Sequence, residues 1–322
     1  MRRGFKIAVT VALSVLALLA FVLMAYRVPD RPVAELAEKW APPPSQFVPV
    51  DGMLVHLRDE GPRDDPVPII LLHGTSDSLH TWEGWARVLS RHRRTIRFDM
   101  PGFGLTGPSP NGDYTIESYV HTLLSVADAL GVERFVVAGN SLGGYVAWAA
   151  AVMHPDRVDR LILVDSAGYP FESASVPLAF RLARTPVLGA AMSDVLPRSV
   201  VASSLENVYG DPSKVTPALV DRYFDLATRE GNRKALVARF EQTKPGALAN
   251  RIPALELPTL ILWGRKDRLI PVEYGERFAR EIKGSRLVVF DLLGHVPQQE
   301  DPVATVAAVE DFLRTGATVA RD

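Results

Sequence analysis

The chain of 322 residues contains no cysteine, which excludes disulfide bonds, thiol catalysis and cysteine-ligated metals. It also lacks a charge imbalance, because 36 lysines and arginines are matched by 37 acidic residues. This near-neutral balance gives no electrostatic reason to expect a nucleic acid as a partner. No internal repeat and no run of like charge is present. The hydrophobic content of 47% and charged content of 23% are typical of a globular protein.

The N-terminal segment is the most apolar part of the chain. Residues 7–26 form a run of 20 without a charge, and three basic residues precede it. As a helix this run is about 30 Å long, the thickness of a bilayer core. We therefore expect residues 1–26 to be a transmembrane anchor, with the membrane as a partner and the remaining chain on the periplasmic or extracellular side. The alternatives are a cleaved signal peptide, with secretion, and a buried core helix.

The region after this segment begins with a linker and continues as alternating strands and helices. Residues 27–45 contain five prolines and read as a Pro-rich linker with one short helix. Continuous apolar strands, such as Leu161–Val164, indicate burial on both faces and hence a mostly parallel sheet flanked by helices. The expected strands are Phe47–Val50, Met53–Arg58, Val67–Leu72, Thr95–Asp99, Arg134–Ala138, Arg160–Val164, Thr259–Trp263 and Arg286–Phe290.

The alternation stops between two of these strands. Residues 170–257 are rich in helix formers, and we expect them to form a helical cap inserted into a core of residues 46–169 and 258–314. An insertion at the carboxyl edge of a parallel sheet lies over the place where such sheets bind ligands.

A serine flanked by glycines is the strongest chemical signal in the sequence. The apolar stretch Phe135–Ala138 leads to Gly139-Asn140-Ser141-Leu142-Gly143, and a helix-forming sequence follows directly. This pattern predicts a strand, a sharp turn and a helix with Ser141 at the apex. The glycines leave room for a strained turn that exposes the Ser141 hydroxyl at a helix N-terminus.

Four short stretches together resemble the α/β-hydrolase superfamily, over nearly all of residues 46–314 apart from the cap. The first two are Leu72-His73-Gly74-Thr75 and Asp99-Met100-Pro101-Gly102-Phe103-Gly104. The serine turn is the third, and the fourth consists of Gly264-Arg265-Lys266-Asp267 with Leu293-Gly294-His295-Val296. The resemblance implies an α/β-hydrolase fold with a mostly parallel eight-stranded sheet, a helical cap and, here, an N-terminal transmembrane helix.

The resemblance also implies roles for individual residues. Ser141 is the expected nucleophile, His295 the general base and Asp267 the acid that orients the imidazole. The backbone amides of Thr75 and Leu142 would form the oxyanion hole. His73, Gly74, Gly139 and Gly143 are expected to be structural residues at the site. Asp165, at the end of another strand, is a substitute candidate for the acid.

No cofactor site is expected from the sequence. The glycine-rich stretches lack the spacing of a dinucleotide fingerprint and the lysine of a phosphate loop. No group of histidines and carboxylates has a metal-ligand spacing, so we expect neither a metal nor a cofactor.

The expected function is hydrolysis of a carboxylic ester with a small to medium, apolar or aromatic acyl group through an acyl-enzyme. Carbon–carbon bond hydrolases of the meta-cleavage type also carry Gly-Asn-Ser at the turn, but this chain has Thr75-Ser76-Asp77-Ser78 where they tend to carry Gly-Pro-Gly. A cofactor-free perhydrolase or haloperoxidase and a non-catalytic binding protein stay as further alternatives. In the cap, Arg181 and Arg184 either meet a substrate carboxylate or face solvent. The sequence leaves the oligomeric state open.

Overall fold

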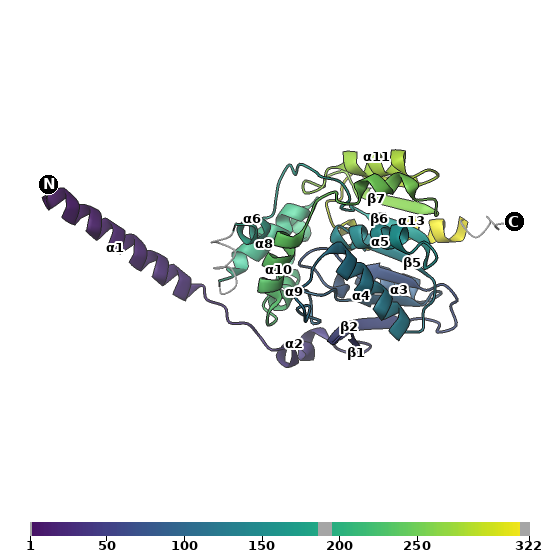
Figure 1. Ribbon diagram of the computed structural model, residues 1–322, viewed down its shortest axis with the longest axis horizontal. Helices are drawn as coiled ribbons and strands as arrows, with labels where there is room; N and C mark the ends of the chain where they lie inside the picture. Colours follow the sequence, from purple (N-terminus) through teal and green to yellow (C-terminus); the bar gives the residue numbers. More distant parts are fainter. Residues whose placement is uncertain (1, 186–194, 316–322) are drawn as a thin grey trace.

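An eight-stranded sheet forms the centre of the computed structural model, which describes residues 2–185 and 195–315 (Figure 1). The strand order is β1-β2-β4-β3-β5-β6-β7-β8. Strand β2 pairs antiparallel with β1 and β4, whereas all other neighbours are parallel. Each of the eight predicted strands is found within a few residues of its expected bounds. They are β1 (Gln46–Val50), β2 (Met53–Glu60), β3 (Ile69–Leu72), β4 (Thr95–Phe98), β5 (Phe135–Asn140), β6 (Val158–Val164), β7 (Thr259–Gly264) and β8 (Arg286–Phe290).

Helices cover both faces of the sheet, which explains why the central strands contain continuous apolar runs such as Ile69–Leu72 and Leu161–Val164. Successive side chains of a strand point to opposite faces. On β3, Ile70 packs into the core beneath α4, α5 and α11, whereas Ile69 packs into the core beneath α3 and α13. The covering helices are α4 (Ile116–Ala129), α5 (Leu142–Met153) and α11 (Val272–Glu281) on one face, and α3 (Glu83–Leu89) and α13 (Pro302–Thr315) on the other.

The described part of the segment between β6 and β7 consists of helices joined by loops. Its helices gather beside one end of the sheet (Figure 1). They are α6 (Leu178–Ala183), α8 (Arg198–Val208), α9 (Pro217–Ala227) and α10 (Asn232–Gln242), with short 3-10 turns at η2 (Pro212–Lys214) and η3 (Ala249–Ala254). Two short elements complete the loop region of the core: η1 (Leu79–Trp82) and α12 (Pro297–Glu300).

The N-terminal helix α1 (Arg2–Ala25) projects away from the body of the molecule (Figure 1). A membrane span requires about 20 consecutive apolar residues. Within residues 2–185 and 195–315, no helix is long and apolar enough to cross a membrane. The predicted transmembrane helix is therefore wrong, and the described residues give no support for the membrane as a partner through it. The position of the remaining chain outside the cytoplasm stays a prediction.

The linker after α1 is fastened to the cap. It contains α2 (Val33–Trp40), which packs on α9. The largely buried carboxylate of Asp225 on α9 accepts hydrogen bonds from Arg31 Nη1 (2.7 Å), Lys39 Nζ (2.9 Å) and Trp40 Nε1 (3.0 Å). One carboxylate on the cap thus holds three side chains of the linker.

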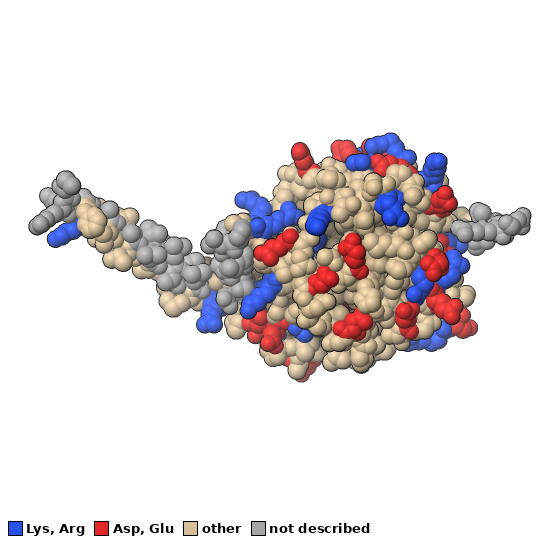
Figure 2. Space-filling model, in the orientation of Figure 1, with Lys and Arg blue, Asp and Glu red and all other residues tan. Residues whose placement is uncertain are grey.

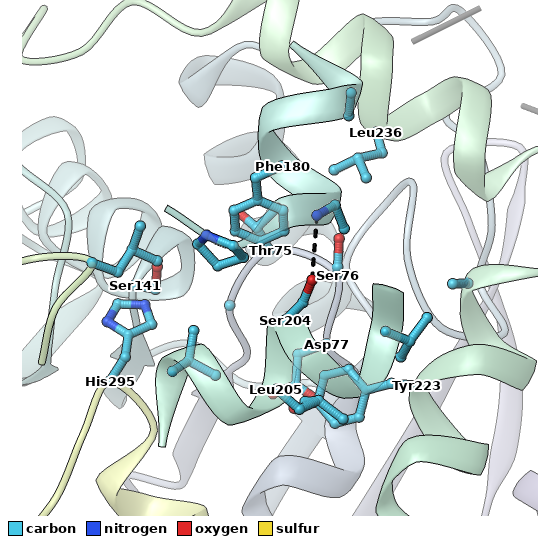
Figure 3. A pocket seen from close by; sticks show the side chains of 18 of the residues that line it. Thr75, Ser76, Asp77, Ser141, Phe180, Ser204, Leu205, Tyr223, Leu236 and His295 are labelled. Atoms are coloured by element: carbon cyan, nitrogen blue, oxygen red, sulfur yellow. Dashed lines mark hydrogen bonds between the residues drawn. The ribbon is translucent and has the colours of Figure 1, made fainter. Parts of the chain in front are cut away.

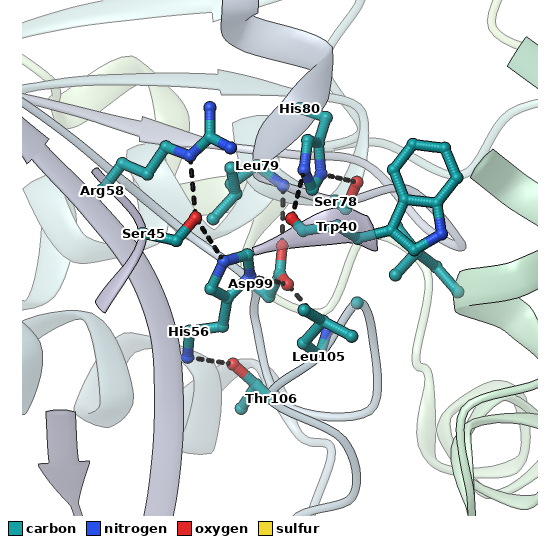
Figure 4. A network of polar contacts seen from close by, with 12 residues as sticks. Trp40, Ser45, His56, Arg58, Ser78, Leu79, His80, Asp99, Leu105 and Thr106 are labelled. Atoms are coloured by element: carbon teal, nitrogen blue, oxygen red, sulfur yellow. Dashed lines mark hydrogen bonds and ion pairs between the residues drawn. The ribbon is translucent and has the colours of Figure 1, made fainter. Parts of the chain in front are cut away.

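A buried carboxylate after β4 organises the loops beneath the cap (Figure 4). Oδ1 of Asp99 accepts from the backbone amide of Leu79 (2.7 Å), and Oδ2 accepts from that of Leu105 (2.7 Å). Oδ2 also lies 2.7 Å from His56 Nδ1, and His56 Nε2 lies 3.0 Å from the Ser45 hydroxyl. Asp99 therefore ties β2, the loop after β3 and the end of the linker together.

We predict that Asp99→Asn lowers the free energy of unfolding by about 3 kcal/mol, because a buried backbone amide then loses its acceptor and the new NH2 group has none. Burial would raise the pKa of Asp99, but the charge and the hydrogen bond of His56 outweigh it and hold that pKa below 3.8. A lowered pKa in the folded state stabilises the fold above the unfolded value and loses this effect as pH falls. Wild-type stability should thus drop below about pH 4 more steeply than that of the variant.

Chemical denaturation between pH 3 and 7 measures the free energy of unfolding of the wild type and of Asp99→Asn, with the exposed Asp156→Asn as control. Equal pH profiles for the wild type and Asp99→Asn would contradict the assignment.

Candidate active site

Ser141 lies at the turn between β5 and α5 in a backbone conformation that few non-glycine residues adopt, with φ of 55° and ψ of −113°. The turn brings the start of α5 against the backbone of neighbouring strands. A Cβ atom at Gly139 would clash with the Gly143 carbonyl, and one at Gly143 would clash with the carbonyl groups of Leu72 and His73. Both positions therefore require glycine, as the sequence pattern predicts.

His295 and Asp267 form a buried pair at the ends of β8 and β7. The Nδ1 atom of His295 lies 2.6 Å from Asp267 Oδ2. The other carboxylate oxygen accepts from the amides of Leu269 (2.8 Å) and Ile270 (3.0 Å), which fixes its orientation. With Nδ1 turned toward the carboxylate, Nε2 of His295 is the nitrogen left to exchange a proton. The imidazole lies beside Ser141 on the wall of a cavity (Figure 3).

Asp165, the substitute candidate for the acid, lies behind this pair and does not contact the imidazole through a hydrogen bond. One oxygen accepts from the Gly264 amide (3.0 Å). Burial raises the pKa of Asp165 well above its usual value, and the negative charge of Asp267 raises it further. Asp165 therefore holds a proton more readily than an exposed carboxyl group, and in its protonated form it is a candidate donor to Asp267. The structure brings Asp267, and not Asp165, to His295.

The loop after β3 carries the other expected residues to the same place. His73 is buried; its Nδ1 lies 2.7 Å from the Gly74 carbonyl, and its Nε2 accepts from the Met100 amide (2.9 Å). These contacts brace the loop so that Thr75 lines the cavity beside Ser141. Leu142 is the first residue of α5, where amides have no partner within the helix. The backbone amides of Thr75 and Leu142 therefore lie beside Ser141. Their role as donors to the oxyanion remains a prediction.

Two positioning residues escaped the sequence analysis. Asn140 Nδ2 donates to the carbonyls of His295 (2.9 Å) and Val164 (3.1 Å), which links the histidine loop to the serine turn. Glu300 Oε2 accepts from the amides of Gly294 (2.9 Å) and Gly210 (3.0 Å), which links the same loop to the cap. The position of Asn140 next to Ser141 was the one signal in the sequence that could have indicated its role. The sequence contained no such signal for Glu300.

A large apolar cavity extends from Ser141 and His295 into the cap (Figure 3). It holds about 950 Å³ of empty space, including solvent at its mouth. The outer face in Figure 2 differs from it, because acidic and basic side chains intermingle there. Among the described residues, the apolar lining consists of Pro177, Ala179, Phe180, Ala183, Leu196, Val201, Leu205, Val208, Ala227, Leu236, Val237, Leu269 and Val296.

One cation in the wall of this cavity is held by the linker. Arg233 on α10 donates through Nη2 to Asp30 Oδ1 (2.6 Å) and to the Val28 carbonyl (2.7 Å). The only acidic side chain among the described lining residues is Asp77. The linker therefore contributes indirectly to the cavity wall, an arrangement that the sequence analysis did not predict.

The choice of acid can be tested by two variants. We predict that Asp267→Asn lowers kcat about 10⁴-fold, because an amide in place of the acceptor favours the wrong imidazole tautomer. Asp165→Asn should cost less than about tenfold, since an amide can replace the protonated carboxyl as a donor to Asp267. Steady-state kinetics with a chromogenic ester measures both. An equal or larger loss in Asp165→Asn would assign the role of the acid to Asp165.

Comparisons with known proteins agree with this architecture. A 2-hydroxy-6-oxo-2,4-heptadienoate hydrolase of Pseudomonas putida is 34% identical over 271 residues, which cover 81% of this chain and 93% of the relative. A meta-cleavage product hydrolase of Pseudomonas fluorescens superposes with a TM-score of 0.72 at 28% identity, over 84% of this chain and 97% of its own. A membrane phospholipase A, described as a bacterial virulence factor, superposes with a TM-score of 0.74 at 26% identity and covers 99% of this chain and 100% of its own.

The names of the first two relatives agree better with the alternative of a carbon–carbon bond hydrolase than with ester hydrolysis. A family model of the α/β-hydrolase fold matches residues 67–302, most of the chain. Together with the sheet order and the loop geometry, this match shows that the chain belongs to the α/β-hydrolase family and is similar to its meta-cleavage product hydrolases.

Proposed function

We propose that the protein is a serine hydrolase that cleaves carboxylic esters with an apolar arm. The observation that carries this proposal is the large cavity beside Ser141, whose described lining is mainly aliphatic and aromatic. Burying an alkyl chain in such a cavity is worth about 0.8 kcal/mol per methylene group. This apolar lining therefore favours a substrate with an alkyl or aromatic arm next to the scissile carbonyl.

The proposed reaction proceeds through an acyl-enzyme. Ser141 Oγ attacks the ester carbonyl carbon while His295 Nε2 takes the hydroxyl proton, and the amides of Thr75 and Leu142 donate to the developing oxyanion. Asp267 stabilises the imidazolium through Nδ1. The imidazolium then protonates the leaving alcohol, and His295 activates the water that releases the carboxylic acid.

A relative supports the ester assignment. The phospholipase A structure covers nearly the whole chain, and the term phospholipase A denotes an enzyme that cleaves carboxylic esters of lipids. An apolar cavity next to the nucleophile suits an acyl chain of that kind.

A second candidate is hydrolysis of a carbon–carbon bond in a meta-cleavage product. The specific observation in its favour is the 34% identity to a heptadienoate hydrolase. The name of that relative's substrate denotes a seven-carbon acid with hydroxyl and keto groups, which is short and polar. The cavity described above is large and apolar, and on this ground we prefer the ester.

A direct comparison of substrates decides between the two. We expect kcat/KM for p-nitrophenyl octanoate to exceed that for 2-hydroxy-6-oxo-2,4-heptadienoate at least tenfold, because only the octanoyl chain fills the apolar cavity. Release of p-nitrophenol and loss of dienoate absorbance measure the two rates. Ser141→Ala, with about 10⁶-fold lower activity, controls for background hydrolysis. The reverse ranking would replace the ester proposal by carbon–carbon bond hydrolysis.

The role of the cavity is tested by changing its volume far from the nucleophile. Ala227 on α9 and Leu236 on α10 line the cavity from the cap, and Leu236 lies away from His295 (Figure 3). Ala227→Phe should lower the ratio of kcat/KM for octanoyl to butyryl esters about tenfold, equivalent to excluding about two methylene groups. Leu236→Ala is the matched variant and should raise the same ratio. An unchanged ratio in both variants would show that the alkyl arm does not enter this cavity.

A further inference from the structure

A second compartment adjoins Ser141 next to the apolar cavity. It holds about 620 Å³ of empty space, including solvent at its mouth, and shares Thr75, Ser141, Phe180 and Leu269 with the apolar cavity. The residues that line the second compartment and not the apolar cavity include Arg184, Arg239 and Phe240. A substrate whose carbonyl reaches Ser141 can therefore extend one arm into each space. The two spaces differ in charge, since the second compartment has two guanidinium groups and, among its described lining residues, no carboxylate.

Arg239 on α10 has no charge partner in the part of the chain described. Its side chain is more than nine-tenths buried, with 8% of the residue exposed, and Nε is completely buried without a hydrogen-bond acceptor. No carboxylate of residues 2–185 and 195–315 lies within 4.0 Å of its guanidinium group. Arg239 also lines a neighbouring cavity, whose lining includes Glu117 and Lys244. Burial lowers the pKa of Arg239 to about 10, which leaves it charged at neutral pH.

Other buried arginines of this protein have a carboxylate partner, so the lack of one at Arg239 among the described residues is unusual. Arg94 bonds to Asp59 through two nitrogen atoms, at 2.9 and 3.0 Å. Arg97 bonds to Glu60 (2.8 Å), and the side chain of Arg233 bonds to Asp30. A buried charge is costly unless it is paired. Arg239 is therefore an exception, and an anion in the compartment that it faces would compensate its charge.

Arg184 is a second cation at the same compartment, and its guanidinium group lies over the ring of Phe240. The guanidinium carbon of Arg184 lies 4.7 Å from the centre of the Phe240 ring, and that of Arg239 lies 5.1 Å from it. The Phe240 ring also meets Phe180, a residue of both compartments, in an edge-to-face contact at 5.5 Å. Arg184 is exposed on its outer side, so it stands at the rim, whereas Arg239 lies inside. The neighbouring Arg181, on α6, is exposed and is not in the lining.

We propose that the second compartment is an anion subsite, in which Arg239 and Arg184 bind a phosphate or carboxylate group of the substrate. This inference rests on the proposed ester hydrolysis and narrows its substrate class to esters with an apolar arm on one side of the scissile carbonyl and an anionic group on the other. A planar guanidinium group binds either anion through two parallel hydrogen bonds. The bond that breaks is the same ester bond, so the chemistry at Ser141 is unchanged.

Two pairs of substrates test the subsite, each with the same chain length and a different charge. In the first pair, 1-octanoylglycerol and its 3-phosphate differ in the alcohol arm. In the second, p-nitrophenyl octanoate and the mono-p-nitrophenyl ester of octanedioic acid differ in the acyl arm. We expect kcat/KM to be at least tenfold higher for the anionic member of one pair, and the pair concerned identifies the arm that lies beside Arg239. Arg239→Met should reduce that ratio at least tenfold, whereas Arg239→Lys should retain part of it.

Further variants make the outcome decisive. Arg184→Met changes an exposed side chain and should lower the same ratio even if Arg239→Met does not fold. Arg181→Met is the matched control on α6 and should leave the ratio unchanged. Two results would overturn the anion subsite alone. One is that the wild type cleaves the neutral and anionic members of both pairs with equal kcat/KM. The other is that a preference for the anionic member persists in both Arg184→Met and a folded Arg239→Met. Failure to cleave any of the four esters would overturn the proposed function as well.

Discussion

The strained backbone at Ser141 is the constraint on which the site depends. A positive φ at a non-glycine residue of this kind costs about 1–3 kcal/mol and persists only where surrounding contacts fix it. Here the Ser141 amide donates to Val164 (3.1 Å), and the Ser141 carbonyl accepts from Tyr145 (3.1 Å) and Ala167 (3.0 Å). These three bonds connect the turn to β6, to α5 and to the loop after β6. The strain is thus held by the central part of the sheet, and none of these three bonds comes from the cap.

The order of the strands explains why the acid and the base arrive at the same place. Strands β5, β6, β7 and β8 are consecutive neighbours, so the loops that follow them lie side by side at one edge of the sheet. Asp165 follows β6, between the serine turn and Asp267, and is necessarily buried against the acid. Its raised pKa is a consequence of this position, since two adjacent buried carboxylates do not both ionise readily. A protonated Asp165 leaves the negative charge on Asp267, where it faces His295.

Local sequence patterns predicted the structural features that depend on consecutive residues. They failed for features that arise where segments distant in the sequence pack together. The apolar run Ile69–Leu72 and the glycines around Ser141 carry their structure in a few consecutive residues, so the strands and the serine turn were predictable. Glu300 and Arg239 look like ordinary surface charges in the sequence, and only the packing of cap on core buries them. The uncharged run of residues 7–26 predicted a span from composition alone, whereas the helices described include none that could cross a membrane. The role of a side chain that lines a pocket is therefore the feature that is hardest to predict from the sequence.

The division between core and cap explains how chemistry and specificity are separated. Ser141, Asp267 and His295 come from loops of the sheet, whereas Arg239, Leu236 and Val201 come from cap helices. The cap can therefore change its side chains without moving the nucleophile or its base. A guanidinium buried without a counter-charge raises the free energy of the ligand-free fold, because a charge in a low-dielectric interior is costly when unpaired. An anion that binds Arg239 would remove this cost at the junction of α10 with the core. Substrate recognition and the packing of the cap on the core would then be energetically coupled through one side chain.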